Sequence, residues 1–333
     1  MQSFWNRLPK PFFCLAPMAD VTDPAFRKLI AEIAKPHVMW TEFVSADGLY
    51  HTREPQKDTA PIYGCDDENP LMRDLQFSEK EHPIVAQIFS GKPDMIAYAS
   101  ALAEELGFDG VDINMGCPDA SIEKQGSGAA LMKDHERAKG LIRAAKDATK
   151  LPVSLKTRIG YGKEALDEWL SALLEAEPAA IVLHLRTRRE MSNVPAHWEL
   201  MARAIALRDA AGSKTLLIGN GDAKDVEDAR AKAAESGADG VMLGRAIFGN
   251  PWLFAGRKPE DAPPAEKLAA LVTLARYFEE LRPAKSFHIL KKHIKAFVSG
   301  FDGAAELRAK LMETESATEL SAVVNARTQT STL

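Results

Sequence analysis

Residues 110–116 read GVDINMG and residues 152–160 read PVSLKTRIG, with the stretch HERAKGLIRAAKDAT at 135–149 between them. Both short runs are apolar at their starts, which is typical of parallel strands covered on both faces. The intervening stretch has the pattern of an amphipathic helix. A strand, a helix and a second strand in this order predict a unit of parallel sheet.

The same alternation extends in both directions along the chain. Further strand-like runs lie at 12–18, 38–44, 83–89, 180–187, 215–221 and 240–246, with helix-like stretches at 95–107, 198–212 and 225–237. About eight such units in roughly 250 residues predict an α/β fold, the TIM (β/α)8 barrel. A doubly wound open sheet is the alternative, which is disfavoured because no strand opens into GxGxxG. The GSGAALM stretch at 126–132 lacks the third glycine and predicts a loop and a helix start.

Two segments fall outside this alternation. The connection 51–82 is rich in Pro, Asp, Glu and Gln, and we expect it over the mouth of the barrel, as a flexible lid or as a solvated insertion without a role. A linker-like stretch at 256–266 is followed only by helical patterns. We therefore expect a catalytic barrel domain at 1–255 and a small helical domain at 262–333.

The composition limits the class of protein. The chain has 333 residues, 46% hydrophobic and 27% charged, as in soluble globular proteins. Its three cysteines have no metal-ligand spacing, and no apolar run approaches the roughly 20 residues that span a bilayer. We expect a cytoplasmic protein with no metal site and no membrane contact. The net charge of −5 means that any affinity for nucleic acid must come from a local basic patch.

Candidate site residues follow the predicted strands, because the active site of a TIM barrel lies at the carboxyl ends of its strands. Glycine-rich turns follow the last two strands, as GNGD at 219–222 and as Gly244 with Arg245. Glycines let backbone N–H groups approach a phosphate, and an arginine adds a fixed cation. These two turns predict a phosphate site.

Two basic residues stand inside apolar strands. Lys156 is predicted to be a Schiff-base amine or to hold the anionic edge of a cofactor, and a lysine that reaches the surface is the weaker alternative. His184 alone would most often be a core residue, but LHLRTRR at 183–189 gathers positive charge at this strand end.

Cysteine chemistry is left open by the residues alone. Cys14 has apolar neighbours and is predicted to be core, whereas Cys117 lies in a turn between Gly116 and Pro118. A free cysteine is usually an inert small hydrophobe, so its position in the turn does not decide between packing and catalysis.

The segment 285–300 predicts an amphipathic helix near the C-terminus. Leu290, Ile294 and Phe297 share its apolar face. A second face carries His288, Lys291, Lys292 and Lys295. A cationic stripe in an acidic chain predicts contact with a phosphate backbone, and a solvated helix face is the alternative.

The chain resembles the tRNA-dihydrouridine synthases, flavin enzymes that reduce uracil rings in tRNA. The matching segments occur in the same order: LAPMADVTDPAFR (15–27), TEFVSADGL (41–49), NMGCP (114–118), QGSGAALM (125–132), SLKTRIG (154–160), HLRTR (184–188), IGNGD (218–222), VMLGRAIFGNPWLF (241–254) and GFDGAAELRAKLMETES (300–316). They cover nearly all of the expected barrel and part of the helical tail.

The resemblance implies FMN as cofactor, NADPH as reductant, tRNA as partner and a monomer. It assigns the catalytic role to Cys117. The residues that it implies for FMN are Pro17, Met18, Ala19, Gln87, Lys156, His184, Asn220, Gly221, Asp222, Gly244 and Arg245. Those expected on the substrate side are Asn114, Arg186, Arg188, Lys291, Lys292 and Lys295.

The implied reaction gives the Cys117 thiol a role. Hydride from reduced FMN would reach C6 of a uridine extruded from the tRNA, and Cys117 would protonate C5. The rival functions are a flavin reductase of a small molecule, a Schiff-base lyase built on Lys156, and a non-catalytic RNA-binding protein. Leu185, Ser192 and Val194 depart from the family pattern on the substrate side, so the resemblance does not identify the target uridine.

Overall fold

The chain forms a closed parallel β-barrel. The computed structural model describes residues 3–54 and 61–330, with side chains described to residue 327. The strands are β1 (Phe12–Leu15), β2 (Met39–Trp40), β3 (Val44–Ser45), β4 (Ile84–Phe89), β5 (Gly110–Met115), β6 (Val153–Arg158), β7 (Ala180–His184), β8 (Leu216–Asn220) and β9 (Gly240–Leu243). They pair in the order β1-β9-β8-β7-β6-β5-β4-β2, and a parallel bridge from Cys14 to Val38 closes the ring. This confirms the predicted TIM barrel.

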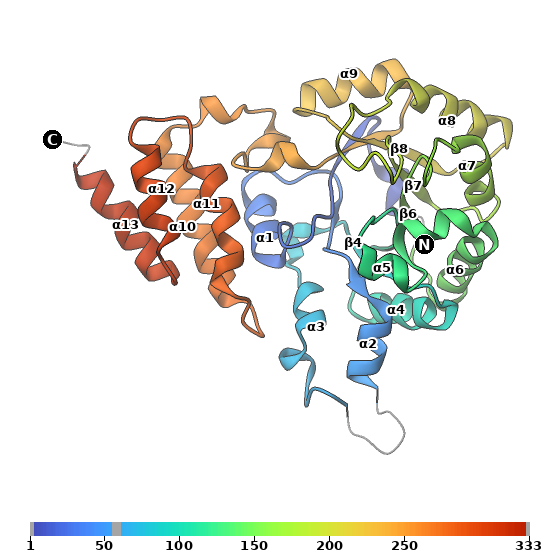
Figure 1. The fold of residues 1–333 in the computed structure, drawn as a ribbon, viewed down its shortest axis with the longest axis horizontal. Helices are drawn as coiled ribbons and strands as arrows, with labels where there is room; N and C mark the ends of the chain where they lie inside the picture. The colour runs from blue at the N-terminus through green and yellow to red at the C-terminus, as the bar shows by residue number, and fades with distance from the viewer. Residues whose placement is uncertain (1–2, 55–60, 331–333) are drawn as a thin grey trace.

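Helices follow the strands and cover the outside of the barrel (Figure 1). They are α1 (Pro24–Ile33), α2 (Ala46–Arg53), α4 (Pro93–Glu105), α6 (His135–Ala148), α7 (Leu166–Leu174), α8 (Glu199–Ala210) and α9 (Val226–Ser236). Aspartates cap three of them: Asp23 accepts from Phe26 N at the start of α1, Asp134 from Arg137 N at the start of α6, and Asp225 from Asp228 N at the start of α9. The predicted helices agree with these bounds to within two residues.

Alternation along the strands determines which side chains enter the barrel. Phe12, Cys14, Val85, Val182 and Ile218 point inward and form a buried cluster. At the amino ends of the strands, Trp5 in the turn η1 (Phe4–Arg7) packs on the rings of Phe12 and Trp40. The barrel is therefore packed solid at this end, and its open space lies at the carboxyl ends.

The second strand differs from the prediction. The single strand expected at 38–44 is two short strands, β2 and β3, separated by Thr41–Phe43. Here the backbone N–H of Gln87 donates to Thr41 Oγ1 at 3.0 Å instead of to a backbone carbonyl, so the ladder is interrupted. The interruption turns Glu42 and Phe43 toward the mouth region.

The described part of the connection 51–82 packs beside the barrel. It contains α3 (Pro70–Asp74), and Glu81 forms a fully buried ion pair with Arg27 of α1 at 2.9 Å. None of residues 61–82 lines the cavities at the mouth described below. The described residues thus give no support to the expected lid, and residues 55–60 lie outside the described part of the chain.

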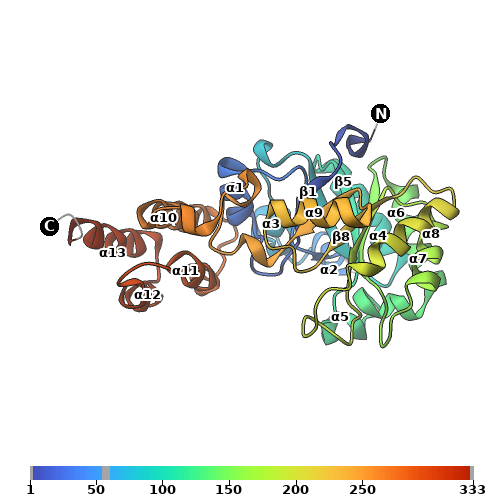
Figure 2. The ribbon, with the colours of Figure 1, turned by 90° about the horizontal axis from the view of Figure 1, so that it is seen from above.

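The C-terminal helices extend the molecule to one side of the barrel (Figure 2). They are α10 (Pro264–Glu280), α11 (Lys291–Phe297), α12 (Ala304–Met312) and α13 (Ala317–Thr330). Helix α10 packs along α1, where Tyr277 donates to Glu32 at 2.5 Å and Lys28 pairs with Glu280 at 3.2 Å. Within the described residues, no helix is long and apolar enough to cross a membrane.

Candidate active site

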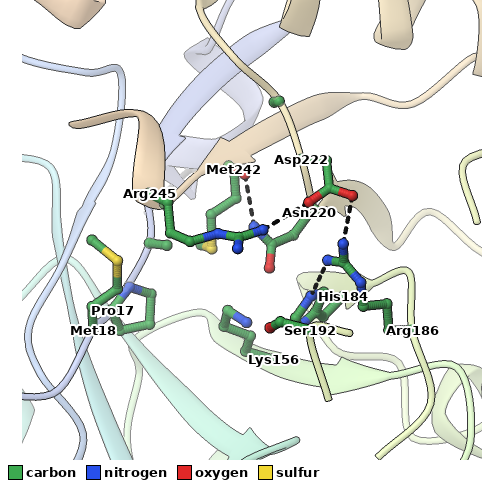
Figure 3. Close-up of a pocket in the computed structure, with 14 residues that line it drawn as sticks. Pro17, Met18, Lys156, His184, Arg186, Ser192, Asn220, Asp222, Met242 and Arg245 are labelled. Atoms are coloured by element: carbon green, nitrogen blue, oxygen red, sulfur yellow. Dashed lines mark hydrogen bonds and ion pairs between the residues drawn. The ribbon is translucent and has the colours of Figure 1, made fainter. Parts of the chain in front are cut away.

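Two adjoining cavities open at the carboxyl ends of the strands. The first, of about 240 Å³, lies over β1, β8 and β9, and its walls include Met18, Asn220 and Arg245 (Figure 3). The second, of about 160 Å³, lies over β4, β5 and β6 and contains Cys117. Both cavities are lined by Pro17, Lys156 and His184, so these three residues lie at the boundary between the two cavities. Ala19 is exposed and lines neither.

The strand register explains why these side chains meet. Asn114 is paired with Lys156, His184 with Asn220, and Asn220 with Met242. Lys156 itself pairs with Val182, and His184 with Arg158, so these inward-pointing positions occupy the last levels of the barrel interior and not a single layer. Gln87 of β4 joins them through Asn114, whose Nδ2 donates to Gln87 Oε1 at 3.2 Å. Residues predicted one by one from strand ends are therefore brought together by the closure of the barrel.

Asp222 organises the first cavity. Its carboxylate accepts from Arg186 Nη2 at 2.5 Å, from Arg245 Nη2 at 2.8 Å and from the backbone N–H of Ala196 at 2.8 Å. Figure 3 shows Arg245 reaching across the cavity toward Asp222, opposite the amine of Lys156. The Arg245 side chain is 66% exposed, so its guanidinium remains open to a ligand.

Gly221 gives this cavity a side-chain-free wall. Its φ is +132°, and a Cβ there would lie 2.6 Å from Ala196 Cβ. Trp198 Nε1 donates to its carbonyl at 2.7 Å. The turn after β8 therefore requires glycine and leaves room for an anion to approach the backbone.

Lys156 lines the cavities as a cation without a partner among the described residues. It has no hydrogen bond or ion pair to any described residue, although it lines both cavities. Burial, followed by repulsion from Arg158, lowers the pKa of Lys156 to about 8. A half-buried lysine with this environment is suited to an anionic group that enters the cavity.

Arg186 fixes the state of His184. Its Nη1 lies 3.2 Å from His184 Nε2 and its Nε donates to Val194 O at 2.6 Å. Arginine only donates, so His184 Nε2 accepts and Nδ1 carries the proton. Burial, helped by Lys156 and neighbouring arginines, lowers the pKa of His184 to about 2. Arg186 is only 2% exposed, so it lies beneath the expected cofactor side and not on an open substrate surface.

The Cys117 turn is held from several directions. Asn114 Oδ1 accepts from the backbone N–H groups of Gly116 at 3.1 Å and Cys117 at 2.9 Å. Ala129 N donates to Cys117 O at 2.9 Å, and Gly128, at φ +59°, packs so close that a Cβ would lie 2.7 Å from that oxygen. The GSGAALM stretch is thus a loop that leads into the short helix η4 (Gly128–Lys133), in line with the predicted loop and helix start, and its backbone supports Cys117.

The thiol stays protonated in this environment. Burial raises the pKa of Cys117 above its usual value, against smaller opposing effects that include the charges of Arg158 and Lys156.

A buried carboxyl group is bonded to Gln87, which lines the same cavity as Cys117. Gln87 donates to the fully buried Asp112 at 2.6 Å. Burial raises the pKa of Asp112 to about 6, although Ser154 also donates to it at 2.6 Å.

Arg188 holds the same turn from outside. Its guanidinium donates to both oxygens of Glu123, at 3.0 and 2.8 Å, and to Pro118 O at 3.4 Å. Arg158, which the sequence places at the end of the same strand as Lys156 but to which no role was assigned, donates to Gly116 O at 3.0 Å and lines the second cavity. Its position two residues after Lys156, on the same face of the strand, was the signal for such a role.

Other cavity residues were also missed by sequence reasoning. Phe43 lines the second cavity, and Ser192 and Met242 line the first. Ser192 is one of the departures from the family pattern; of the other two, Leu185 is buried and Val194 accepts from Arg186. Phe43 and Met242 lie inside the family-like segments TEFVSADGL (41–49) and VMLGRAIFGNPWLF (241–254), but as ordinary apolar residues they were given no role.

The cationic stripe near the C-terminus is only partly exposed. The expected helix is a short turn, η8 (Phe287–Leu290), followed by α11, and Leu290, Ile294 and Phe297 are buried as predicted. Lys291 corrects the prediction, because its side chain is 9% exposed and pairs with Glu315 at 2.8 Å. His288, Lys292 and Lys295 remain on the outer face.

In the described residues, no group of three or more His, Cys, Asp or Glu side chains is arranged to hold a metal ion. The ligand-binding chemistry of the two cavities instead depends on amide, guanidinium, ammonium and backbone N–H donors. This donor set is suited to anions and to planar heterocycles with carbonyl groups.

Comparison with known proteins agrees with this geometry. The family model described as "Dihydrouridine synthase (Dus)" matches residues 14–332. Similar proteins include the probable tRNA-dihydrouridine synthase of Staphylococcus aureus (strain Mu50), 40% identical over 330 residues that cover 97% of this chain and 95% of the relative. Another is the probable tRNA-dihydrouridine synthase 2 of Bacillus subtilis (strain 168), 40% identical over 334 residues and covering 97% and 96%.

Solved structures share the fold at low identity. Morphinone reductase has a TM-score of 0.52 and 13% identity, covering 75% of this chain and 86% of its own. A 2-naphthoyl-CoA reductase has a TM-score of 0.54 and 9% identity, covering 75% and 50%. The match of the family model to nearly the whole chain, and the identity to its curated relatives, show that the chain belongs to the dihydrouridine synthase family.

Proposed function

We propose that the protein is a tRNA-dihydrouridine synthase, which reduces the C5=C6 bond of uridines in tRNA to 5,6-dihydrouridine. The single observation that carries the proposal is the placement of unpartnered Lys156 and protonated Cys117 in the wall of the same cavity, the second. Lys156 is suited to hold the anionic edge of a cofactor, and Cys117 is suited to deliver a proton. Family membership supplies the substrate class.

The first cavity fits FMN. Its Gly221 wall, Arg245 and the backbone around Gly244 would hold the ribityl phosphate, with Asp222 fixing the guanidinium. Lys156 would meet the anionic edge of the ring system, and His184 would donate from Nδ1. Pro17 and Met18 would pack on the ring, and Gln87 and Asn114 would lie beside it. Bound FMN, once reduced, supplies the hydride.

The residues of the second cavity perform the remaining steps. Cys117 holds a proton on Sγ and donates it to C5 of the uracil, leaving a thiolate that water reprotonates. The positive charges of Arg158 and Lys156 stabilise that thiolate. Asn114 keeps the turn in place during the transfer through its bonds to the N–H groups of Gly116 and Cys117.

Substrate binding would use both parts of the chain. A uridine inside folded tRNA cannot reach a cavity at the end of a barrel, so it must be extruded from its stack. We propose that His288, Lys292 and Lys295 on the helical part at 262–333 contact the phosphate backbone. Such contacts orient the RNA without reading its sequence.

The test is a direct assay of the product. The purified protein is incubated with an unmodified tRNA transcript and NADPH, which we propose as the electron donor. The RNA is then digested and analysed by mass spectrometry for uridine that has gained two hydrogens. Dihydrouridine at a defined position supports the proposal and identifies the target. A yellow protein that oxidises NADPH but modifies none of several transcripts would instead be a reductase of small molecules.

A further inference from the structure

A lysine from the C-terminal part of the chain is buried in the wall of the barrel. Lys285 lies in the segment between α10 and η8, yet its side chain is only 6% exposed. Its Nζ lies 3.1 Å from Glu42 Oε2 and 3.6 Å from Asp20 Oδ1. Neighbouring residues of the same segment, such as Arg282 and Ser286, are exposed. The Lys285 side chain is therefore inserted between the loop after β1 and the interruption between β2 and β3, and does not follow the surface.

Glu42 accepts the hydrogen bond from the inserted Lys285 side chain. Its side chain is 7% exposed, and its second oxygen, Oε1, accepts the backbone N–H of Asp20. Asp20 has a φ of +55°, in the left-handed region that aspartate tolerates better than most residues, and its N–H is directed at Glu42 in this conformation. One carboxylate thus joins the loop after β1 to the interruption between β2 and β3.

Both joined segments contribute to the active-site cavities. The loop after β1 supplies Pro17 and Met18, and Met18 O accepts from the N–H groups of Val21 and Thr22, each at 3.0 Å. The residue after Glu42 is Phe43, which lines the cavity that contains Cys117. A shift of Glu42 would therefore move cavity walls on two sides.

The carboxylate depends on Lys285 for its charge balance. Burial raises the pKa of Glu42 to about 7, and the nearby Asp23 and Asp74 add to the effect, while Lys285 opposes it. Burial likewise opposes the charge of Lys285, but the carboxylates of Glu42, Asp23 and Asp74 raise its pKa above the usual value. Removing the lysine would leave a buried carboxyl group that must either carry an unpaired charge or take up a proton, and either change weakens the bonds it makes to its neighbours.

We infer that Lys285 is a positioning residue for the reaction, which holds Glu42 and through it the active-site loop at Pro17–Asp20. The inference rests on the proposed function. It makes the segment before α11 part of the support of the cavity. The exposed His288 and Lys292 lie a few residues further along the chain, in η8 and α11. Lys292 Nζ is 4.0 Å from Asp20 Oδ2. Contact of RNA with this segment would therefore act on the loop that carries Pro17 and Met18.

The first measurement needs neither flavin nor RNA. Amide hydrogen exchange of the full-length, flavin-free chain is compared between the parent and Lys285→Met, for peptides that cover residues 17–22 and 41–46. The variant should exchange faster at both, because the bond from Asp20 N–H to Glu42 is weakened. Lys28→Met is the matched control, since it removes a lysine at the same junction from an exposed ion pair with Glu280. Unchanged exchange in Lys285→Met would overturn the inference.

The second measurement tests the consequence for the site. Flavin affinity is measured by fluorescence quenching, and Lys285→Met should bind at least roughly tenfold more weakly, with kcat reduced more than the KM for tRNA is raised. Lys285→Arg should retain most of the affinity. The double variant Lys285→Met/Glu42→Gln should recover affinity relative to Lys285→Met, because no charge is left unpaired.

The outcomes separate the inference from the proposed function. If the parent binds flavin but makes no dihydrouridine, the proposed function fails. The amide exchange and the flavin affinity of the variants still test the positioning role of Lys285. If Lys285→Met does not fold, amide exchange and flavin affinity are compared between the parent, Lys285→Arg and the double variant, and this comparison tests the inference. A double variant that binds flavin no better than Lys285→Met, with exchange at residues 17–22 and 41–46 unchanged from the parent, would show that the pair does not position the loop.

Discussion

Asn114 accepts the backbone N–H of Cys117 with its side-chain oxygen at 2.9 Å. The two residues therefore behave as one unit, in which an amide three positions earlier fixes the turn that carries the thiol. The other end of the Asn114 amide donates to Gln87 at 3.2 Å, which ties the turn to β4. The position of the thiol depends on this amide as well as on packing.

We expect Asn114→Ala to lower kcat by about tenfold or more, because a displaced proton donor loses the alignment that the transfer requires. The matching test is a double-mutant cycle in single-turnover reduction of tRNA. In a Cys117→Ala background, Asn114→Ala should cost little further, since the group that it positions is already absent. Fully additive losses would show that Asn114 acts independently of the thiol.

Cys117→Ala should retain flavin and tRNA binding and lose turnover by roughly 100-fold or more, the usual contribution of a general acid. Flavin absorbance, tRNA affinity and the rate of dihydrouridine formation are measured on the same preparation. Cys65→Ala is the control, because Cys65 is an exposed free cysteine outside both cavities. A normal rate in Cys117→Ala would exclude the thiol as the proton source.

Gly221→Ala should weaken FMN binding by about tenfold or more. The substitution places a Cβ 2.6 Å from Ala196 Cβ and forces a side chain onto a φ of +132°. The wall offered to the phosphate would then move. Gly256→Ala also changes a glycine of positive φ, but no atom lies within 4 Å of its Cβ. It should lose some stability and keep the flavin, so equal flavin loss in the two variants would contradict the assignment.

The sequence predicts the barrel and most of its top layer because both depend on local periodicity. A lysine within an apolar strand and a glycine-rich turn after one are visible without the fold. The environment of Lys285 was not predictable, since its partner Glu42 lies 243 residues away and meets it only when two parts of the chain pack. Lys291 was assigned to the wrong face for the same reason: a helical projection does not show Glu315 arriving from beyond α12.

Lys156 should destabilise the flavin-free protein. Its pKa is lowered by burial from 10.5 to about 8, so the folded state binds its proton less tightly than the unfolded state does. The resulting cost is fully present below about pH 8, declines as the pH rises toward 10.5, and is absent above it. Lys156→Met should therefore raise the free energy of unfolding at pH 7 by on the order of 2 kcal/mol, and by less at pH 10. Urea unfolding of flavin-free protein at both pH values measures this, and a variant less stable than the parent at pH 7 would refute it.

If α11 contacts RNA as proposed, the contact should be limited to its outer lysines. Lys292 and Lys295 lie on the exposed side, whereas Lys291 is buried against Glu315. Changing Lys292 and Lys295 to Gln should weaken tRNA binding and reduce the slope of log Kd against log salt by about 0.9 for each phosphate contact that is lost. Lys291→Gln on the same helix should lower stability and leave the slope unchanged, because its ammonium is committed to a carboxylate. Binding measured by filter retention across a salt series distinguishes these outcomes. A slope that changes with Lys291→Gln, but not with the other two, would place the RNA on a different face of the helix.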